Sequence, residues 1–259
     1  AHAVTVKTSS GTGVTWAAAD KGTKMVYSDG TNVVDTAFTD LSSDYTPQLS
    51  ATLDTNAQNI IIDSTKGIID ENSNEQITFT TTSAAVNNFG ITNAATGNTP
   101  SLAAVGGDTN IDFNITPKGI GRATFNGQGK IQSVAEKVTT EATAATGTLN
   151  YDVLTQAVWN LTTNAAANWT LNVRGDGSNS LDSIMDTGES ITVAHIVSQG
   201  GTAYYNSAFT IDGSSVTPEW QGGAAPTEGN ASSLDTYTYT IIKTASATFT
   251  VLAAQTQFA

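Results

Sequence analysis

Residues 108–127, with the sequence DTNIDFNITPKGIGRATFNG, constrain the fold more than any other stretch of this chain. Isoleucine and phenylalanine alternate with polar residues over 111–116, which is the pattern of a strand with one buried face. Pro117 and Gly119 then favour a turn, because proline fixes φ and glycine can take a left-handed conformation. A second short strand is predicted over 122–125, and it ends in the Asn-Gly pair that suits a tight hairpin.

The predicted hairpin and the segments before it carry few apolar side chains. Over residues 54–129 we expect short strands, including 59–63, 76–81 and 89–92, each with one narrow apolar face. A face of that width cannot form a core alone, so a neighbouring segment or copies of the same chain must cover it. In a bundle of three chains each face would meet two others, and we therefore expect an elongated trimeric β shaft.

The composition favours β structure with many turns. Hydrophobic residues make up 39% and charged residues only 13% of the 259 positions, whereas small and hydroxylated residues are abundant. The formal net charge of -13 disfavours nucleic acid and anionic membranes as partners. The chain has no cysteine and no apolar run of membrane-spanning length, so we expect neither thiolate metal sites nor membrane insertion.

Three regions follow from these patterns. Residues 1–40 are predicted to form a small β domain that starts inside a strand, so we expect the natural polypeptide to be longer at its N-terminus. A connector with one short helical turn over 39–45 leads into the shaft of residues 41–130. Residues 131–259 are predicted to form a C-terminal head.

The head is predicted to be an antiparallel β-sandwich of jelly-roll-like type. Its strands are longer and richer in aromatic residues than those of the shaft, and their density is typical of two packed sheets. The clearest strands are expected at 158–161, 169–173, 190–198, 215–220, 236–243 and 247–252. The predicted fold class is therefore all-β, with a shaft of short strands followed by a sandwich head.

Several of these motifs resemble a known family. Asp-Thr-Asn-Ile-Asp followed by Thr-Pro-Lys-Gly-x-Gly, over 108–121, is similar to a repeat in tail-fibre proteins of tailed bacteriophages, especially phages of marine bacteria. Residues 67–79 and 92–100 resemble the shaft of that family, and residues 220–226 and 243–249 resemble its C-terminal module. These are turn and strand motifs without a catalytic signature, so the resemblance implies a structural protein and not an enzyme.

The resemblance implies a virion protein, a tail fibre that is extracellular after release from the host cell. Its expected partners are further copies of the chain in a homotrimer, other virion tail proteins, and a glycan or outer-membrane receptor of the host. No cofactor is expected. Two alternatives stay open: a capsid decoration or head-fibre protein, and a polysaccharide depolymerase spike with paired carboxylates.

The long polar loops of the head are the predicted receptor-binding region. They cover residues 174–189, 199–206 and 221–234, and loops at the end of a sandwich commonly form binding surfaces. Exposed aromatic rings beside polar groups suit a sugar, because a ring stacks on its apolar face while polar groups bind its hydroxyls. The residues predicted to contact the receptor are Tyr204, Tyr205, Trp220, Asp176, Asn179, Asp182, Gln221 and Asn230.

His195 lies within a predicted strand and shares a face with Ile191, Val193 and Val197. We expect a packed and hydrogen-bonded core or interface histidine, and the alternatives are a metal ligand or a pH sensor. The aromatic residues expected in the core or the subunit interface are Trp159, Trp169, Tyr237 and Tyr239, and the same role is the alternative for Tyr204 and Tyr205.

Two acidic stretches, residues 70–75 and 176–182, offer oxygen ligands at close spacing. Both depart from the EF-hand pattern, because they lack its glycine at position six and its glutamate at position twelve. We expect solvated turns and no metal site, with calcium binding as the alternative.

Overall fold

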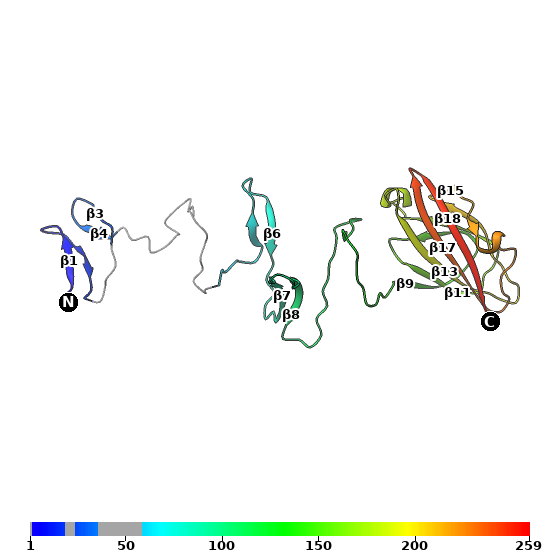
Figure 1. Cartoon of the computed structure of the whole chain (residues 1–259), viewed down its shortest axis with the longest axis horizontal. Coiled ribbons are helices and arrows are strands. Elements are labelled where there is room, and N and C mark those ends of the chain that lie inside the picture. Colours follow the sequence, from blue (N-terminus) through cyan, green and yellow to red (C-terminus); the bar gives the residue numbers. More distant parts are fainter. Residues whose placement is uncertain (1, 19–23, 36–58) are drawn as a thin grey trace. The chain divides into compact units, whose positions relative to one another are not determined.

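The computed structural model describes residues 2–18, 24–35 and 59–259. Strands hold 44% and helices 3% of these residues, which confirms the predicted all-β class. The chain divides into two compact units, Ala1–Ile111 and Asp112–Ala259 (Figure 1). The predicted helical turn over 39–45 lies outside the described residues.

The first unit opens with two short antiparallel hairpins. They consist of β1 (Val4–Lys7) with β2 (Gly13–Trp16), and of β3 (Val26–Ser28) with β4 (Val33–Asp35). Val33 N donates a hydrogen bond of 3.0 Å to Thr12 O, which joins the second hairpin to the first. The described residues of the predicted domain 1–40 therefore form β hairpins.

Two further hairpins follow in the same unit. They consist of β5 (Lys66–Ile69) with β6 (Glu75–Phe79), and of β7 (Asn87–Thr92) with β8 (Ser101–Gly106). β6 and β7 confirm the strands predicted over 76–81 and 89–92. No strand forms over 59–63, because the partner of β6 begins only at Lys66.

Aspartate side chains organise turns in these hairpins. Asp29 Oδ1 accepts a hydrogen bond of 2.7 Å from Asn32 N. Asp70 Oδ1 likewise accepts from the backbone N–H groups of Asn72 and Asn74, at 2.8 Å each. These bonds favour the ionised carboxylate and lower the pKa of both aspartates. The Asp70 carboxylate, one of the candidate calcium ligands, is thus engaged with the turn between β5 and β6.

None of the described residues before Ala145 is buried, although many of them are apolar. Ile61 is 90% exposed, Ile91 84% and Phe125 75%. Burying a side chain of this size stabilises a folded protein by about 1.5–3 kcal/mol, and a single chain gains none of that stabilisation at these three positions. The shortage of core expected from the sequence is therefore present in the folded chain.

The strands predicted over 111–116 and 122–125 do not form within this chain. Alternation specifies which side chains share a face, but a strand also needs a second segment to which its backbone can hydrogen-bond. The predicted turn between them is present: φ of Gly119 is 62°, and Gly121 N donates to Lys118 O at 3.1 Å. The Asn-Gly pair that follows forms no hairpin.

The second unit contains a sandwich of two sheets (Figure 1). The four-stranded sheet has the order β10 (Gly147–Asp152), β12 (Trp169–Arg174), β14 (Asn206–Ile211), β15 (Ser214–Ser215). The six-stranded sheet has the order β16 (Glu219–Trp220), β18 (Thr248–Phe258), β17 (Leu234–Ala245), β13 (Ser190–Ser198), β11 (Val158–Thr163), β9 (Val138–Ala144). A short helix, α1 (Leu181–Ile184), and a 3-10 turn, η2 (Gln221–Gly223), lie in the connections.

The chain winds back and forth between these two sheets. From β9 to β14 successive strands alternate between the sheets, so strands that share a sheet are two elements apart and run parallel. Antiparallel pairing is limited to β13 with β17, β17 with β18, and β14 with β15. The predicted antiparallel, jelly-roll-like arrangement is therefore wrong for the strands from β9 to β14, because side-chain alternation reports the buried face and not the neighbouring strand.

Strand positions in the head are predicted better than their pairing. The strands expected at 158–161, 169–173, 190–198, 236–243 and 247–252 correspond to β11, β12, β13, β17 and β18. The segment 215–220 is not one strand, since β15 pairs with β14 in one sheet and β16 pairs with β18 in the other. Residues 216–218, with the sequence Val-Thr-Pro, lie between these strands, and the chain crosses there from one sheet to the other.

Aromatic rings fill the space between the sheets. Trp159, Trp169, Tyr237 and Tyr239 are buried, as predicted. Trp169 meets Tyr237 edge to face at 5.5 Å, and Phe209 stacks on Tyr239 at 4.6 Å between ring centroids. Such contacts contribute beyond the area that they bury, so this cluster fixes how the two sheets face each other.

His195 lies within this aromatic core and is 0% exposed. Its ring centroid is 5.2 Å from that of Trp159 and 6.0 Å from that of Trp169. The expected packing is confirmed, but the expected hydrogen bond is absent, since neither ring nitrogen has a partner with hydrogen-bond geometry. Burial disfavours the charged ring and lowers the pKa of His195 to about 3. The nearby backbone of Trp159 has the smaller, opposite effect of favouring the charged ring and raising the pKa.

We predict that His195 makes the head less stable as the pH falls below 6.5. The folded pKa of about 3 lies below the ordinary value of 6.5, so stabilisation is complete above pH 6.5 and is lost progressively towards pH 3. Urea unfolding, followed by tryptophan fluorescence, should show a loss of about 2 kcal/mol between pH 7.5 and 5.0. His195→Leu should remove this part of the pH dependence, since the other titrating groups are common to both proteins. The same pH dependence in both would contradict the prediction.

Candidate ligand-binding surfaces of the sandwich

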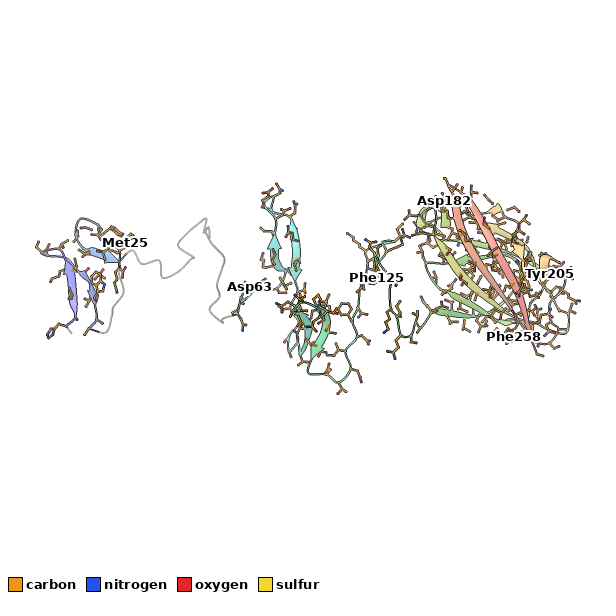
Figure 2. All side chains as sticks on the ribbon, viewed as in Figure 1. Met25, Asp63, Phe125, Asp182, Tyr205 and Phe258 are labelled. Atoms are coloured by element: carbon orange, nitrogen blue, oxygen red, sulfur yellow. The ribbon has the colours of Figure 1, made fainter. Side chains whose placement is uncertain are left out.

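The eight residues predicted to contact a receptor do not meet in one site. Asp182 contacts Lys243 near one end of β17, whereas the loop with Tyr204 is tied to Asp235 near the other end. Asp235 and Lys243 are about 26 Å apart along the strand, at 3.3 Å per residue. Figure 2 accordingly shows Asp182 and Tyr205 at different ends of the head. The predicted residues therefore belong to separate surfaces.

The first surface is a shallow polar pocket of about 360 Å³, lined by Asp176, Asn179, Arg174 and Asp212 among others. Asp176 Oδ1 accepts hydrogen bonds from Ser178 N at 2.7 Å and from Asn179 N at 2.8 Å. These bonds, that of Ser178 first, lower the pKa of Asp176. Asp212 accepts from two backbone N–H groups at the start of α1. Both carboxylates already accept hydrogen bonds from the protein backbone, so this pocket offers a ligand few free acceptors.

Asp182 ties α1 to the hairpin of β17 and β18. Lys243 Nζ lies 2.7 Å from Asp182 Oδ1 and donates to Met185 O at 2.9 Å. Ala247 N also donates to Asp182 Oδ1, at 2.7 Å. The hydrogen bond from Lys243 is the main cause that lowers the pKa of Asp182. Its role in this structure is to hold elements together.

The second surface is organised by a buried glutamine, Gln199. Its Nε2 donates to Tyr204 O at 2.6 Å and to Asp235 Oδ2 at 2.9 Å, and its Oε1 accepts from Tyr204 N at 3.0 Å. Asn230 N donates to the same carboxylate at 3.1 Å. A Cβ on Gly229 would lie 2.2 Å from Tyr204 O, so only glycine lets the two loops approach this closely. We call these contacts the Gln199 clasp.

The two adjacent tyrosines of this surface are half-buried. Tyr204 packs against the core, and Tyr205 N donates to Asn168 Oδ1 at 3.1 Å. Burial raises the pKa of Asp235, the other partner of Gln199, although hydrogen bonds from Asn230 and Gln199 oppose the shift. The tyrosines are therefore held in place, and none of the pockets described here is lined by them.

The third surface is a pocket of about 480 Å³ beside β18, lined by Trp220, Gln221, Ala224, Pro226, Gln255, Thr256 and Gln257. The ring of Trp220 meets that of Tyr239 edge to face at 6.0 Å between centroids. Gln255 Nε2 donates to Glu228 O at 3.1 Å and to Tyr237 Oη at 3.0 Å. The pocket thus combines one fixed aromatic ring with several amide groups and no charged side chain.

Two of the predicted residues, Trp220 and Gln221, lie in this third pocket. Sequence reasoning missed Gln255 and Gln257, because it ended the last strand at Leu252. β18 continues to Phe258, and the alternation that places Val251 and Ala253 inward continues to both glutamines. The same alternation over residues 253–257 was the signal in the sequence that could have placed both glutamines on this strand.

The largest of the described pockets is apolar and lies elsewhere. It measures about 510 Å³ and is lined by Val153, Leu154, Ile184, Ile191 and residues near Arg122. Arg122 donates to both carboxylate oxygens of Glu189 at 2.7 Å and to Asp186 Oδ2 at 2.6 Å. These partners raise the pKa of Arg122, that of Glu189 most. We interpret this pocket as the crevice where residues 120–122 dock on the sandwich.

Among residues 2–18, 24–35 and 59–259, no three His, Cys, Asp or Glu side chains are grouped to hold a metal ion. Within the same residues no helix is long and apolar enough to cross a membrane. Comparisons with protein-family models, curated proteins and solved structures found no match for this chain.

We predict that Gln199→Leu loosens the loop that carries Tyr204. The substitution keeps the approximate size but removes three hydrogen bonds, and it leaves Asp235 with fewer donors, which should cost about 1–3 kcal/mol. Hydrogen exchange at residues 200–205 should become faster, and chemical unfolding should report the lower stability. Gln132→Leu, at an exposed glutamine, is the control and should change neither. Unchanged exchange in Gln199→Leu would refute a role for the clasp.

Proposed function

We propose that this protein is a non-enzymatic bacteriophage structural protein, a homotrimeric tail fibre whose sandwich head binds a glycan on the host cell surface. The motifs quoted above suggest the class. The observation that carries the proposal is the exposure of apolar side chains throughout the described residues before Ala145. A chain that functioned alone would leave these side chains in water, whereas an assembly of copies would bury them.

The hairpins illustrate how copies would complete one another. Ile68 lies opposite Ile77 in the first, and they are 49% and 51% exposed. Ile91 lies opposite Leu102 in the second, and they are 84% and 57% exposed. A two-stranded hairpin is marginally stable by itself in water. Three such faces around one axis would cover each other, which supports a trimer.

The pocket beside β18 supports the glycan part of the proposal. An indole ring can stack on the apolar face of a sugar, and glutamine amides both donate to and accept from hydroxyl groups. The lining of Trp220, Gln221, Gln255 and Gln257 offers these groups without a charge. A shallow pocket binds weakly by itself, but three copies on one trimer would raise the overall affinity through avidity.

We predict that the full chain forms a trimer in solution. Native mass spectrometry should give three times the chain mass of 26.7 kDa. Ile91→Asp places a charge on the face that the trimer buries, and should weaken association by about 2 kcal/mol or more per chain. Asn88→Asp, on the opposite face of the same strand, is the matched control and should assemble normally. A monomer at micromolar concentration would rule the trimer out.

We predict that glycan binding depends on the pocket beside β18. Gln221 is exposed, so Gln221→Ala should leave the fold intact. It should weaken binding on a host-glycan array by about fivefold to tenfold, since one hydrogen bond contributes about 1–1.5 kcal/mol. Trp220→Ala should abolish binding, and Tyr205→Ala should not change it. If Tyr205→Ala weakened binding and Gln221→Ala did not, the site would lie on the surface of the Gln199 clasp.

Two further measurements separate this proposal from its alternatives. Release of reducing sugar from host polysaccharide would indicate a depolymerase in place of a passive receptor-binding protein. Antibody labelling of virions should mark the tail, and labelling of the capsid would indicate a decoration protein.

A further inference from the structure

Four strands of the six-stranded sheet, β11, β13, β17 and β18, have an outward face without charge. Along β11, β13, β17 and β18 the buried residues alternate with outward ones, for example Tyr237 and Tyr239 with Thr238. Every outward residue on these four strands is aliphatic, aromatic, hydroxylated or an amide. We call this surface the neutral face. Glu219 on β16 borders it at one edge.

The neutral face is made of small side chains at its centre. Ala194, Thr238 and Ala254 lie side by side on β13, β17 and β18. In the next row, the hydroxyl oxygens of Thr192 and Thr240 are 3.2 Å apart and hydrogen-bonded. Over β17 and β18 these short side chains leave a shallow hollow of about 420 Å³, which Thr238, Thr240 and Leu252 line together with residues of β16. Short side chains let another chain approach the sheet closely.

We infer that the neutral face is where the heads of neighbouring chains contact one another in the trimer. This inference rests on the proposed trimer and adds the surface that the heads use. The molecule that covers the neutral face is a second copy of this chain, because the face carries no charge that would repel an acidic copy. Each chain carries a net charge of -13, so copies repel wherever their acidic surfaces meet. A cationic partner would seek carboxylates, which this face does not offer, whereas an acidic copy can approach it without like-charge contact.

The size of the face agrees with a partial interface. Four strands at 4.8 Å spacing, with the nine residues of β13 at 3.3 Å each, give a surface of about 19 by 30 Å. That is roughly 600 Å² per chain, somewhat below the roughly 800 Å² per partner of a standard stable interface. The head contact would therefore add to the contact between hairpins and would not replace it.

The test uses the absence of cysteine in the chain. Thr238→Cys places a single thiol on the neutral face, and Thr170→Cys places one on the outward side of the four-stranded sheet. Both threonines are half-buried and lie between two small neighbours, Thr170 between Thr148 and Ala208. In the intact full-length assembly, a bulky maleimide should react about tenfold more slowly at position 238 than at position 170, because an interface core excludes solvent. In denaturant both thiols should react at the same rate.

A second pair of variants tests the energetic role of the face. Thr238→Glu should lower the melting temperature of the assembled protein more than Thr170→Glu does, because only the first introduces like charges at a subunit contact. A trimer in which the two cysteines react equally would overturn this inference and leave the proposed fibre intact. A monomer by mass would overturn both.

Discussion

Burial of apolar side chains between two sheets stabilises only the C-terminal part of this chain. From Ala145 onward the structure has a core of aliphatic and aromatic residues, whereas the described residues before it have none. The head can therefore be stabilised by its own interior. The hairpins form their backbone hydrogen bonds locally, but isolated pairs of strands gain too little from them to be stable. This division is why the proposed assembly matters most for the first part of the chain.

Much of the fold could be predicted from local patterns, and the rest depended on partners distant in sequence. Alternation located β13 and β17 well, since one face of each strand is buried against the aromatic core. It did not reveal that β11 and β12 lie in opposite sheets, because a strand with one buried face shows the same alternation in either sheet. Residues 111–116 show the limit most clearly: the pattern is that of a strand, and the single chain provides no strand there.

The candidate site was predicted in part for a similar reason. Trp220 and Gln221 were recognisable as an aromatic ring beside an amide in a polar loop, and the structure places both in one pocket. The contact of Asp182 with Lys243 could not be predicted, because the two residues are 61 positions apart. Carboxylates in acidic loops look available in a sequence, yet here Asp70, Asp176 and Asp182 all accept hydrogen bonds from the backbone of their own fold.

The neutral face and the glycan pocket are neighbours along β18. Thr256 points outward on β18 and lines the pocket, and Trp220 and Gln221 also line the hollow over Thr238, Thr240 and Leu252. Glu219 pairs with Leu252, which is outward, and Trp220 pairs with Ala253, which is buried. The indole therefore turns towards Tyr239 and the interior, while its neighbour borders the neutral face. Three heads that pack through β11, β13 and β17 would leave the pocket at the β16 edge of each sheet open. The three pockets would then be held at a fixed spacing by continuous strands, and a fixed spacing is what allows weak binding to several sugars of one surface to become strong.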